Sequence, residues 1–229
     1  MATELAAASM ALGRRYAAGA TLWCWSPRWP EHADHVAVEF VHPVIVGKRA
    51  LPASVVDGHD AIATLRTLVS PGDVLVAVAG EDDEVVASGM RRARAWGVTT
   101  ILIGAGGRPP AGLADHQLWY GDDNPDAPHN GAFVLLYHLL WELTHVCFEH
   151  PGLVNAAPSD GGTEEVCITC SDEGRLGEVM EIPHHDGTRV RTATGVEDVD
   201  TTLVDPVGPG DLVLVHAGVA ISRLDGEGP

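Results

Sequence analysis

The sequence predicts an α/β domain that is followed by a small β-barrel. In residues 1–150, short apolar runs of the kind that form buried strands alternate with longer stretches of helical periodicity. Residues 151–165 have neither period and are rich in proline, glycine, serine and aspartate, which is typical of a linker. Residues 166–229 consist mainly of short β-prone runs separated by turns. We therefore expect a first domain at 1–150, a linker at 151–165 and a second domain at 166–229.

The first domain starts with an alanine-rich helix, which leads into a short apolar strand and a second helix beginning at Pro30. Pro71, Gly72 and Asp73 form a turn into the buried strand VLVAVA, and a further helix, a strand and a closing helix follow. Strand–helix–strand units of this length form a parallel sheet that helices cover on both faces. The predicted helices are residues 2–19, 30–41, 81–96 and 130–148, and the predicted strands are 21–25, 74–79 and 99–103.

The second domain is predicted to contain strands at 176–182, 189–194, 200–204 and 211–215. His-Asp-Gly, Thr-Gly and Gly-Pro-Gly turns separate these runs. Short strands divided by such turns favour a small barrel.

The charge of the chain excludes two classes of partner. The sequence has 14 Lys and Arg residues against 32 Asp and Glu residues, which gives a formal net charge of -18 and a pI of about 4.8. A field of this sign repels nucleic acid and anionic membrane surfaces. We expect neither to be a partner.

The sequence also predicts a location. In MATELAAASMALGRRYAAGA, Glu4 precedes every basic residue and no uninterrupted apolar core follows, so a signal peptide is not predicted. No other stretch has the length and purity of a transmembrane helix. The chain has four cysteines, of which Cys24 and Cys147 fall on apolar elements and are expected to be buried. Cysteines in a chain with no predicted secretion signal are typical of a reducing compartment. We therefore expect the protein to be located in the cytoplasm.

The other two cysteines, Cys167 and Cys170, form a Cys-x-x-Cys pair within EEVCITCSDEG. A structural zinc site needs four ligands, and this domain has no second Cys-x-x-Cys and no His-x-x-x-His, so zinc is disfavoured. Thioredoxin-like redox chemistry needs the pair at a helix start in a βαβ unit, which a barrel does not supply. A disulfide between the two cysteines, formed on oxidation, is kept as an alternative interpretation.

The strongest motif is LVDPVGPGDLVLVHAGVAISRLDGE at 203–227, which closely resembles the end of the HypC family (HypC, HybG, HupF). These proteins are small chaperones of [NiFe]-hydrogenase maturation. GEVMEI at 177–182 is similar to a strand near the start of the family's sequences. The resemblance covers about residues 166–226 and implies an OB-like β-barrel.

The resemblance also implies a function. In the family, a cysteine at the start of the barrel holds iron, together with the partner HypD, while cyanide and carbon monoxide ligands are installed. The chaperone then takes the Fe(CN)2CO unit to the hydrogenase large-subunit precursor. A thiolate suits this task because it is a soft ligand that exchanges between partners. Cys167 would be the ligand, with Cys170 as the other candidate, and His216 would orient or tune the site, although a half-buried histidine bonded to a carbonyl is the alternative.

The first domain resembles a second family. GDVLVAVAGEDDEVVASGMRRARAWGVTTILIGAGG at 72–107 looks like the middle of a sugar isomerase (SIS) domain of the phosphoheptose isomerase branch. HADHVAVEFVHPVIVGKRALPASVV at 32–56 is similar to the helix after the first strand of that branch and to the segment that follows it. The resemblance spans about residues 5–150. It implies a flavodoxin-like three-layer sandwich that forms homo-oligomers.

SIS enzymes grip sugar phosphate with two loops rich in serine, threonine and glycine. The corresponding stretches here are WSPRWP at 25–30 and AGEDDE at 79–84. Prolines remove backbone donors from the first, and the carboxylates of the second cap a helix start while repelling phosphate. We therefore expect a chaperone without turnover, and keep a sugar or sugar-phosphate isomerase and a sugar-sensing regulatory protein as alternatives.

Part of the isomerase metal site is present in the sequence. His35 and Glu39 are spaced i, i+4 on one helix, as the zinc ligands of phosphoheptose isomerases are, and His138 resembles the family's distant histidine ligand. Asn130 takes the position of the family's glutamine ligand. The resemblance implies zinc, and the alternative is a hydrogen-bonded cluster or part of a subunit interface.

Overall fold

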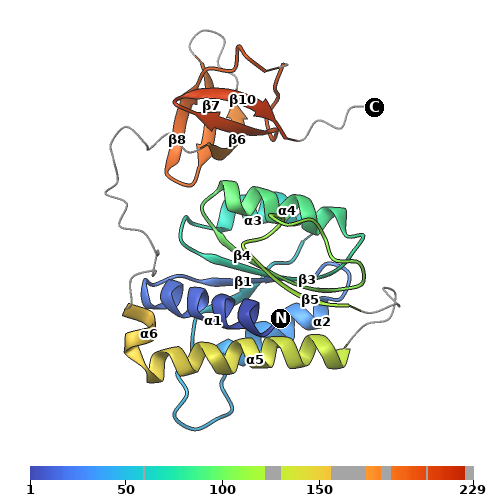
Figure 1. Cartoon of the computed structure of the whole chain (residues 1–229), viewed down its shortest axis with the longest axis vertical. Coiled ribbons are helices and arrows are strands. Elements are labelled where there is room, and N and C mark those ends of the chain that lie inside the picture. The colour runs from blue at the N-terminus through green and yellow to red at the C-terminus, as the bar shows by residue number, and fades with distance from the viewer. Residues whose placement is uncertain (59, 122–129, 156–173, 182–186, 205, 225–229) are drawn as a thin grey trace. The chain divides into compact units, whose positions relative to one another are not determined.

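The computed structural model describes residues 1–58, 60–121, 130–155, 174–181, 187–204 and 206–224. These residues divide into two compact units, one built on a parallel sheet and the other on an antiparallel sheet (Figure 1).

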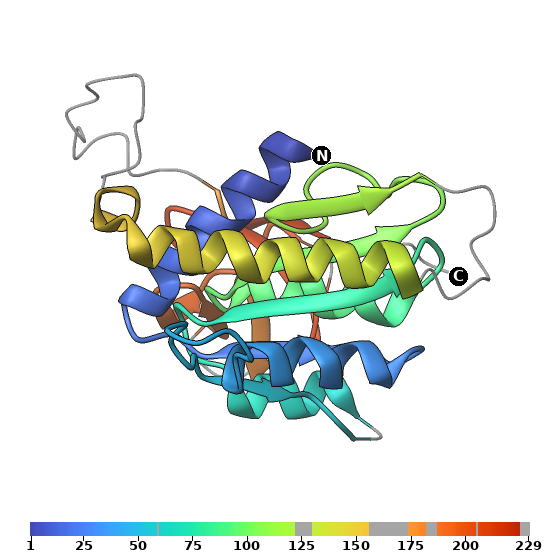
Figure 2. The same ribbon diagram turned by 90° about the horizontal axis from the view of Figure 1, so that it is seen from below.

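The first unit is a three-layer α/β sandwich, as predicted. Its five strands are all parallel and lie in the order β2-β1-β3-β4-β5. Helices α1, α2 and α5 cover one face of the sheet, and α3 and α4 cover the other (Figures 1 and 2). The strands are β1 (Leu22–Trp25), β2 (Ala53–Val55), β3 (Val74–Gly80), β4 (Thr99–Ala105) and β5 (His116–Tyr120). The helices are α1 (Ala2–Ala17), α2 (Pro30–Val41), α3 (Ala61–Leu68), α4 (Glu84–Ala95), α5 (Asn130–Glu149) and α6 (Pro151–Asn155).

The centre of the sheet explains the unbroken apolar runs in the sequence. Every residue of β3 and of β4 is buried. A parallel strand between two helical layers has no solvent face, so its sequence does not alternate. The core below the sheet joins the strands to the helices of one face through Leu12, Phe40, Val76, Ile101 and Leu140.

Helices α2 and α5 pack against each other and carry the residues of the candidate metal centre. Pro30 occupies the first turn of α2, where its missing N–H costs no hydrogen bond. Ala33, Val36 and Phe40 point into the core, which leaves His35 and Glu39 at the edge of the buried face.

Helix α5 is apolar over most of its length. By length and composition alone, Gly131–Glu149 could cross a membrane, since its mean hydropathy is 1.3. Leu136, Leu140 and Trp141 lie in the core of the first unit, and the core helix of a globular domain passes the same test. The apolar character of α5 is therefore explained by its packing.

The predicted helices and strands of the first unit are all present, and α2 has the predicted bounds. The sequence missed β2, α3 and β5, and α6 lies within the stretch predicted as a linker. β2 and β5 are short edge strands, too short to display a period. α3 had a signal that was overlooked, because Asp60 caps it by accepting a hydrogen bond from the backbone N–H of Ala63.

The second unit is an antiparallel sheet in the order β10-β9-β6-β7-β8. Its strands are β6 (Arg175–Glu181), β7 (Thr188–Thr192), β8 (Gly195–Val199), β9 (Leu212–His216) and β10 (Val219–Arg223). The core consists of Val179, Val190, Val199, Val213, Val215 and Ala220.

A single bridge makes this sheet barrel-like, as predicted. The outer strands are β8 and β10, and Asp200, directly after β8, pairs with Val219 at the start of β10. Ala220 donates its backbone N–H to the Asp200 carbonyl at 2.8 Å, and Asp200 donates to Gly218 at 2.9 Å. The two edges of the sheet therefore meet.

Two strand assignments in this unit require correction. The predicted strand at 200–204 is wrong, because the strand lies at 195–199 and ends where the Asp200 side chain accepts the N–H of Thr202 in a turn. β10 was missed, although Ala217 and Gly218 form a two-residue turn with positive φ angles of 51° and 79° that signals a hairpin.

Candidate functional site

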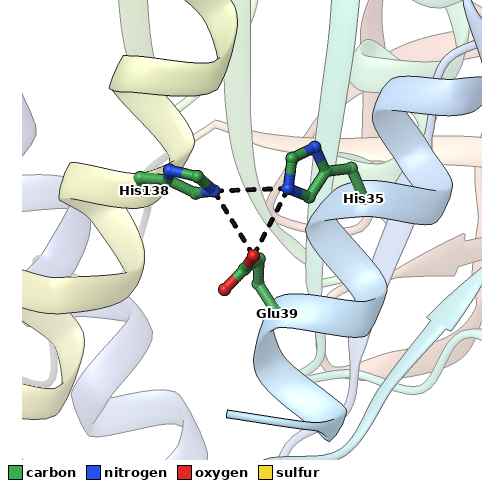
Figure 3. Close-up of side chains that lie close together, drawn as sticks. All are labelled: His35, Glu39 and His138. Atoms are coloured by element: carbon green, nitrogen blue, oxygen red, sulfur yellow. Dashed lines mark hydrogen bonds and ion pairs between the residues drawn. The ribbon is translucent and has the colours of Figure 1, made fainter. Parts of the chain in front are cut away.

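Three side chains with metal-binding atoms converge between α2 and α5 (Figure 3). His35 Nε2 lies 3.3 Å from Glu39 Oε1 and 3.3 Å from His138 Nε2. The third side of the triangle, from His138 Nε2 to Glu39 Oε1, is 3.4 Å long. The structure thus brings together three of the four residues predicted as metal ligands.

The cluster lies at the surface of the first unit and not in its core. The side chains of His35, Glu39 and His138 are 37%, 20% and 43% exposed. Two imidazoles and a carboxylate are ligands that Zn²⁺ takes in sites with an open coordination position. The donor set and its access to solvent therefore fit an exchangeable zinc ion.

Asn130, the fourth predicted ligand, starts α5 eight residues before His138. A rise of 1.5 Å per residue separates the two positions by about 12 Å along the helix axis. The Asn130 side chain lies outside the described part of the structure, so its place among the ligands stays a prediction.

A buried tyrosine and a buried histidine lie behind the cluster, and sequence reasoning missed both. The Tyr137 hydroxyl is 2.8 Å from His35 Nδ1 and 3.4 Å from His32 Nδ1. Burial, together with the negative charge of Glu39, raises the pKa of Tyr137 to about 12. The available signal was position, since Tyr137 precedes a predicted ligand and His32 lies three residues before another.

The loops that follow β1 and β3 are joined by an ion pair. In a sheet of this order, ligands bind where the strand order reverses, between the ends of β1 and β3. Here Arg28 and Asp82 lie 3.1 Å apart at that position, and both lie close to Gly80 together with Trp29. The loss of the phosphate grip stays a prediction from the sequence.

The acidic loop after β3 acts on its own helix and on a neighbouring loop. Asp83 accepts a hydrogen bond from the backbone N–H of Val86 at 3.0 Å, which caps the start of α4. Glu81 accepts one from the N–H of Gly107. Asp83 therefore occupies an amide at the start of α4, and amides at helix starts are groups that bind anions.

His216 is the last residue of β9 and is partly buried, immediately before the Ala217–Gly218 turn. Its neighbour Val215 pairs with Arg175, the first residue of β6. His216 therefore lies at the end of the barrel where the chain enters its first strand. Cys167 and Cys170 lie outside the described residues, and their relation to His216 stays a prediction.

Comparison with known proteins identifies the second unit. Residues 174–228 match the model of the HupF/HypC family. The match begins one residue before β6 and extends beyond β10, so the whole HupF/HypC-like barrel described above falls within it. No curated protein matches the chain in sequence.

The first unit is similar to solved phosphoheptose isomerases. The enzyme of Francisella tularensis has a TM-score of 0.55 at 17% identity, over 63% of this chain and 86% of the other. Phosphoheptose isomerase GmhA of Neisseria gonorrhoeae has a TM-score of 0.51 at 16% identity, over 62% and 85%. At this identity the similarity shows the fold alone. The predicted fusion of an SIS-like unit with a HupF/HypC-like unit is confirmed.

Proposed function

We propose that the protein is a cytoplasmic maturation factor for [NiFe]-hydrogenases, in which the barrel carries iron and the SIS-like unit serves as a platform. The proposal rests on the match of residues 174–228 to the HupF/HypC family. The cargo is the Fe(CN)2CO unit. A HypD-like partner loads it, and the large-subunit precursor of the hydrogenase receives it.

In this proposal Cys167 supplies the thiolate ligand to iron, with Cys170 as the second candidate. Both cysteines precede β6 in the sequence, and the chain enters β6 at the His216 end of the barrel. His216 is therefore suited to orient the thiolate or to hold its charge.

The decisive experiment compares Cys167→Ala with Cys170→Ala after anaerobic purification with the HypD-like partner. The two variants are matched controls, because they make the same change three residues apart. We expect Cys167→Ala to lose the partner, the iron and the infrared bands of cyanide and carbon monoxide, and Cys170→Ala to keep them. The reverse pattern would move the ligand to Cys170, and an effect of neither variant would reject the proposal.

We further propose that His35, Glu39 and His138 bind Zn²⁺, and that the SIS-like unit forms homo-oligomers. The convergence of the three ligand atoms supports the first proposal. A bound zinc ion would supply a Lewis acid at this position. Zinc retained at one equivalent after dialysis, and lost in His35→Ala, is the expected result.

The alternative function is an isomerase or a sugar-sensing regulatory protein. It is supported by the fold and by a pocket of about 600 Å³ between α4 and the loop 107–113, which Arg91 and Arg108 line. That volume suits a small ligand. The Asp82 carboxylate, beside Gly80 at the end of β3, argues against isomerase activity because it repels a phosphate. Saturable sugar-phosphate binding that is lost in Glu39→Ala would favour this alternative.

A further inference from the structure

The three ligand candidates are supported from one side by a buried pair, Tyr137 and His32. Tyr137 is 1% exposed and His32 is 3% exposed, whereas the cluster in front of them is open to solvent. Tyr137 contacts His35 at Nδ1, and the other ring nitrogen of His35 contacts Glu39 and His138. Nδ1 of His35 therefore contacts the buried pair, and Nε2 contacts the other two ligand candidates.

We propose that Tyr137 is the positioning residue of this centre, whose hydroxyl holds His35 in the orientation and tautomer that present Nε2 to the metal. The inference rests on the metal site proposed above. Tyr137 contacts no metal itself, and it acts through His35.

The number of protons fixes the direction of the hydrogen bonds. A neutral imidazole has one N–H, and a metal bound at Nε2 uses the lone pair there, so the proton of His35 is on Nδ1. Nδ1–H then donates to the Tyr137 oxygen at 2.8 Å. The proton of Tyr137 is left to donate to Nδ1 of His32, at 3.4 Å, which makes this second hydrogen bond the weaker one.

The surroundings keep this chain of hydrogen bonds in place. The rings of His35 and Tyr137 have centroids 5.1 Å apart, and those of His32 and Tyr137 are 5.9 Å apart. Phe133 packs against the other side of His32 at 5.3 Å. Close packing prevents the rings from rotating freely. A tyrosine hydroxyl is protonated at neutral pH, so the Tyr137 O–H is available as a donor.

Tyr137→Phe removes the hydroxyl and keeps the ring. We expect its affinity for Zn²⁺, measured by competition with a chromophoric chelator, to fall by roughly 10- to 100-fold, as for other residues that orient metal ligands. Tyr16→Phe is the matched control, because Tyr16 is also buried and its hydroxyl has no hydrogen-bond partner in the described structure. Its affinity should equal that of the wild type.

The melting temperatures of the metal-free proteins first show whether each variant folds. The Zn²⁺ affinities then distinguish three results. Weaker binding in Tyr137→Phe alone supports the inference, and equal binding in all three proteins rejects it. A wild-type protein that binds no Zn²⁺, or a His35→Ala variant that binds normally, rejects the metal site itself and the inference with it.

A second measurement needs no variant and covers a failure of Tyr137→Phe to fold. In the zinc-loaded wild-type protein, ¹⁵N spectra of the histidines should show His35 protonated at Nδ1 and His32 protonated at Nε2 only. If the spectra place the proton of His32 on Nδ1, that nitrogen cannot accept a hydrogen bond from the Tyr137 hydroxyl. The proposed direction of the hydrogen bonds would then be wrong.

Discussion

Arg28 Nη1 lies 3.1 Å from Asp82 Oδ1, and this ion pair links the loops that follow β1 and β3. The pair lies at the position at which parallel sheets of this order bind their ligands. Trp29, which is buried, packs beside it. The ion pair has consequences for binding and for stability.

We expect ketose phosphates to leave the melting temperature of the wild-type protein unchanged at millimolar concentration. Arg28→Ala should not restore binding, because the Asp82 carboxylate stays beside Gly80 and repels a phosphate. The variant should also lose less than about 1 kcal/mol of stability, since both charges are partly exposed. Thermal shift assays test both statements. A sugar-phosphate shift in either protein would contradict the first.

Gly104→Ala should destabilise the first unit by about 1–3 kcal/mol, because the Trp119 ring lies directly over Gly104 on the neighbouring strand. Trp119 is fixed by a hydrogen bond from its ring N–H to the Gly106 carbonyl at 2.9 Å. Gly131→Ala on α5 is the control. An added methyl group there meets nothing within 4 Å, so the variant should gain a few tenths of a kcal/mol or stay neutral. Urea unfolding distinguishes the two, and equal stability of both variants would refute the packing argument.

Cys24 and Cys147 should resist alkylation in the folded protein. Both are buried, and burial raises the pKa of each thiol, so the reactive thiolate is scarce at pH 8. Iodoacetamide followed by peptide mass spectrometry should find both unmodified in buffer and modified in denaturant. Labelling of either at the same rate in both conditions would show that the packing is wrong.

Lys48 joins the loop after α2 to the end of α5, through Glu149 at 2.9 Å and Glu142 at 3.3 Å. The hydrogen bond from Lys48 lowers the pKa of Glu149 below its ordinary value of 4.5. A lowered carboxyl pKa stabilises the fold above the ordinary value, and this contribution is lost as the pH falls through the folded pKa.

The expected test is a comparison of wild-type protein with Glu149→Gln at two pH values. The wild type should be the more stable at pH 7, and the difference should shrink as the pH falls below the ordinary carboxyl pKa of 4.5 and through the lower pKa of the folded state. Chemical unfolding at both pH values gives the two differences. A difference that is constant with pH would mean that the charge of Glu149 has no part in it.

Local patterns predicted the helices and central strands of the first unit, because burial on both faces leaves long apolar runs such as VLVAVA. The i, i+4 spacing placed His35 and Glu39 on one helix face, and family resemblance supplied His138. Tyr137 could not be found this way, since its neighbours Leu136 and Leu140 make it look like any core residue. Its role depends on where the hydroxyl points, and that is a property of packing between α2 and α5.

In the barrel, the family resemblance was clear and the local patterns placed the strands less well. Its resemblance to the HypC family was evident from VLVHAGVAI, while the strand at 195–199 was misplaced, because two of the five residues in GVEDV are acidic and the sequence looks like a turn. Among the described strands, this one lies at the end of the sheet order, where charged side chains are common.

The packing of α1 against α5 determines when the first unit can complete its core during synthesis. α1 is synthesised before α5, and its apolar residues Leu5 and Leu12 belong to a core that α5, more than a hundred residues later, helps to form. β1 likewise pairs with β3, which is distant in the sequence. Contacts between distant parts of a chain form slowly and leave apolar surface exposed meanwhile. The core of the first unit therefore stays incomplete until α5 has been synthesised.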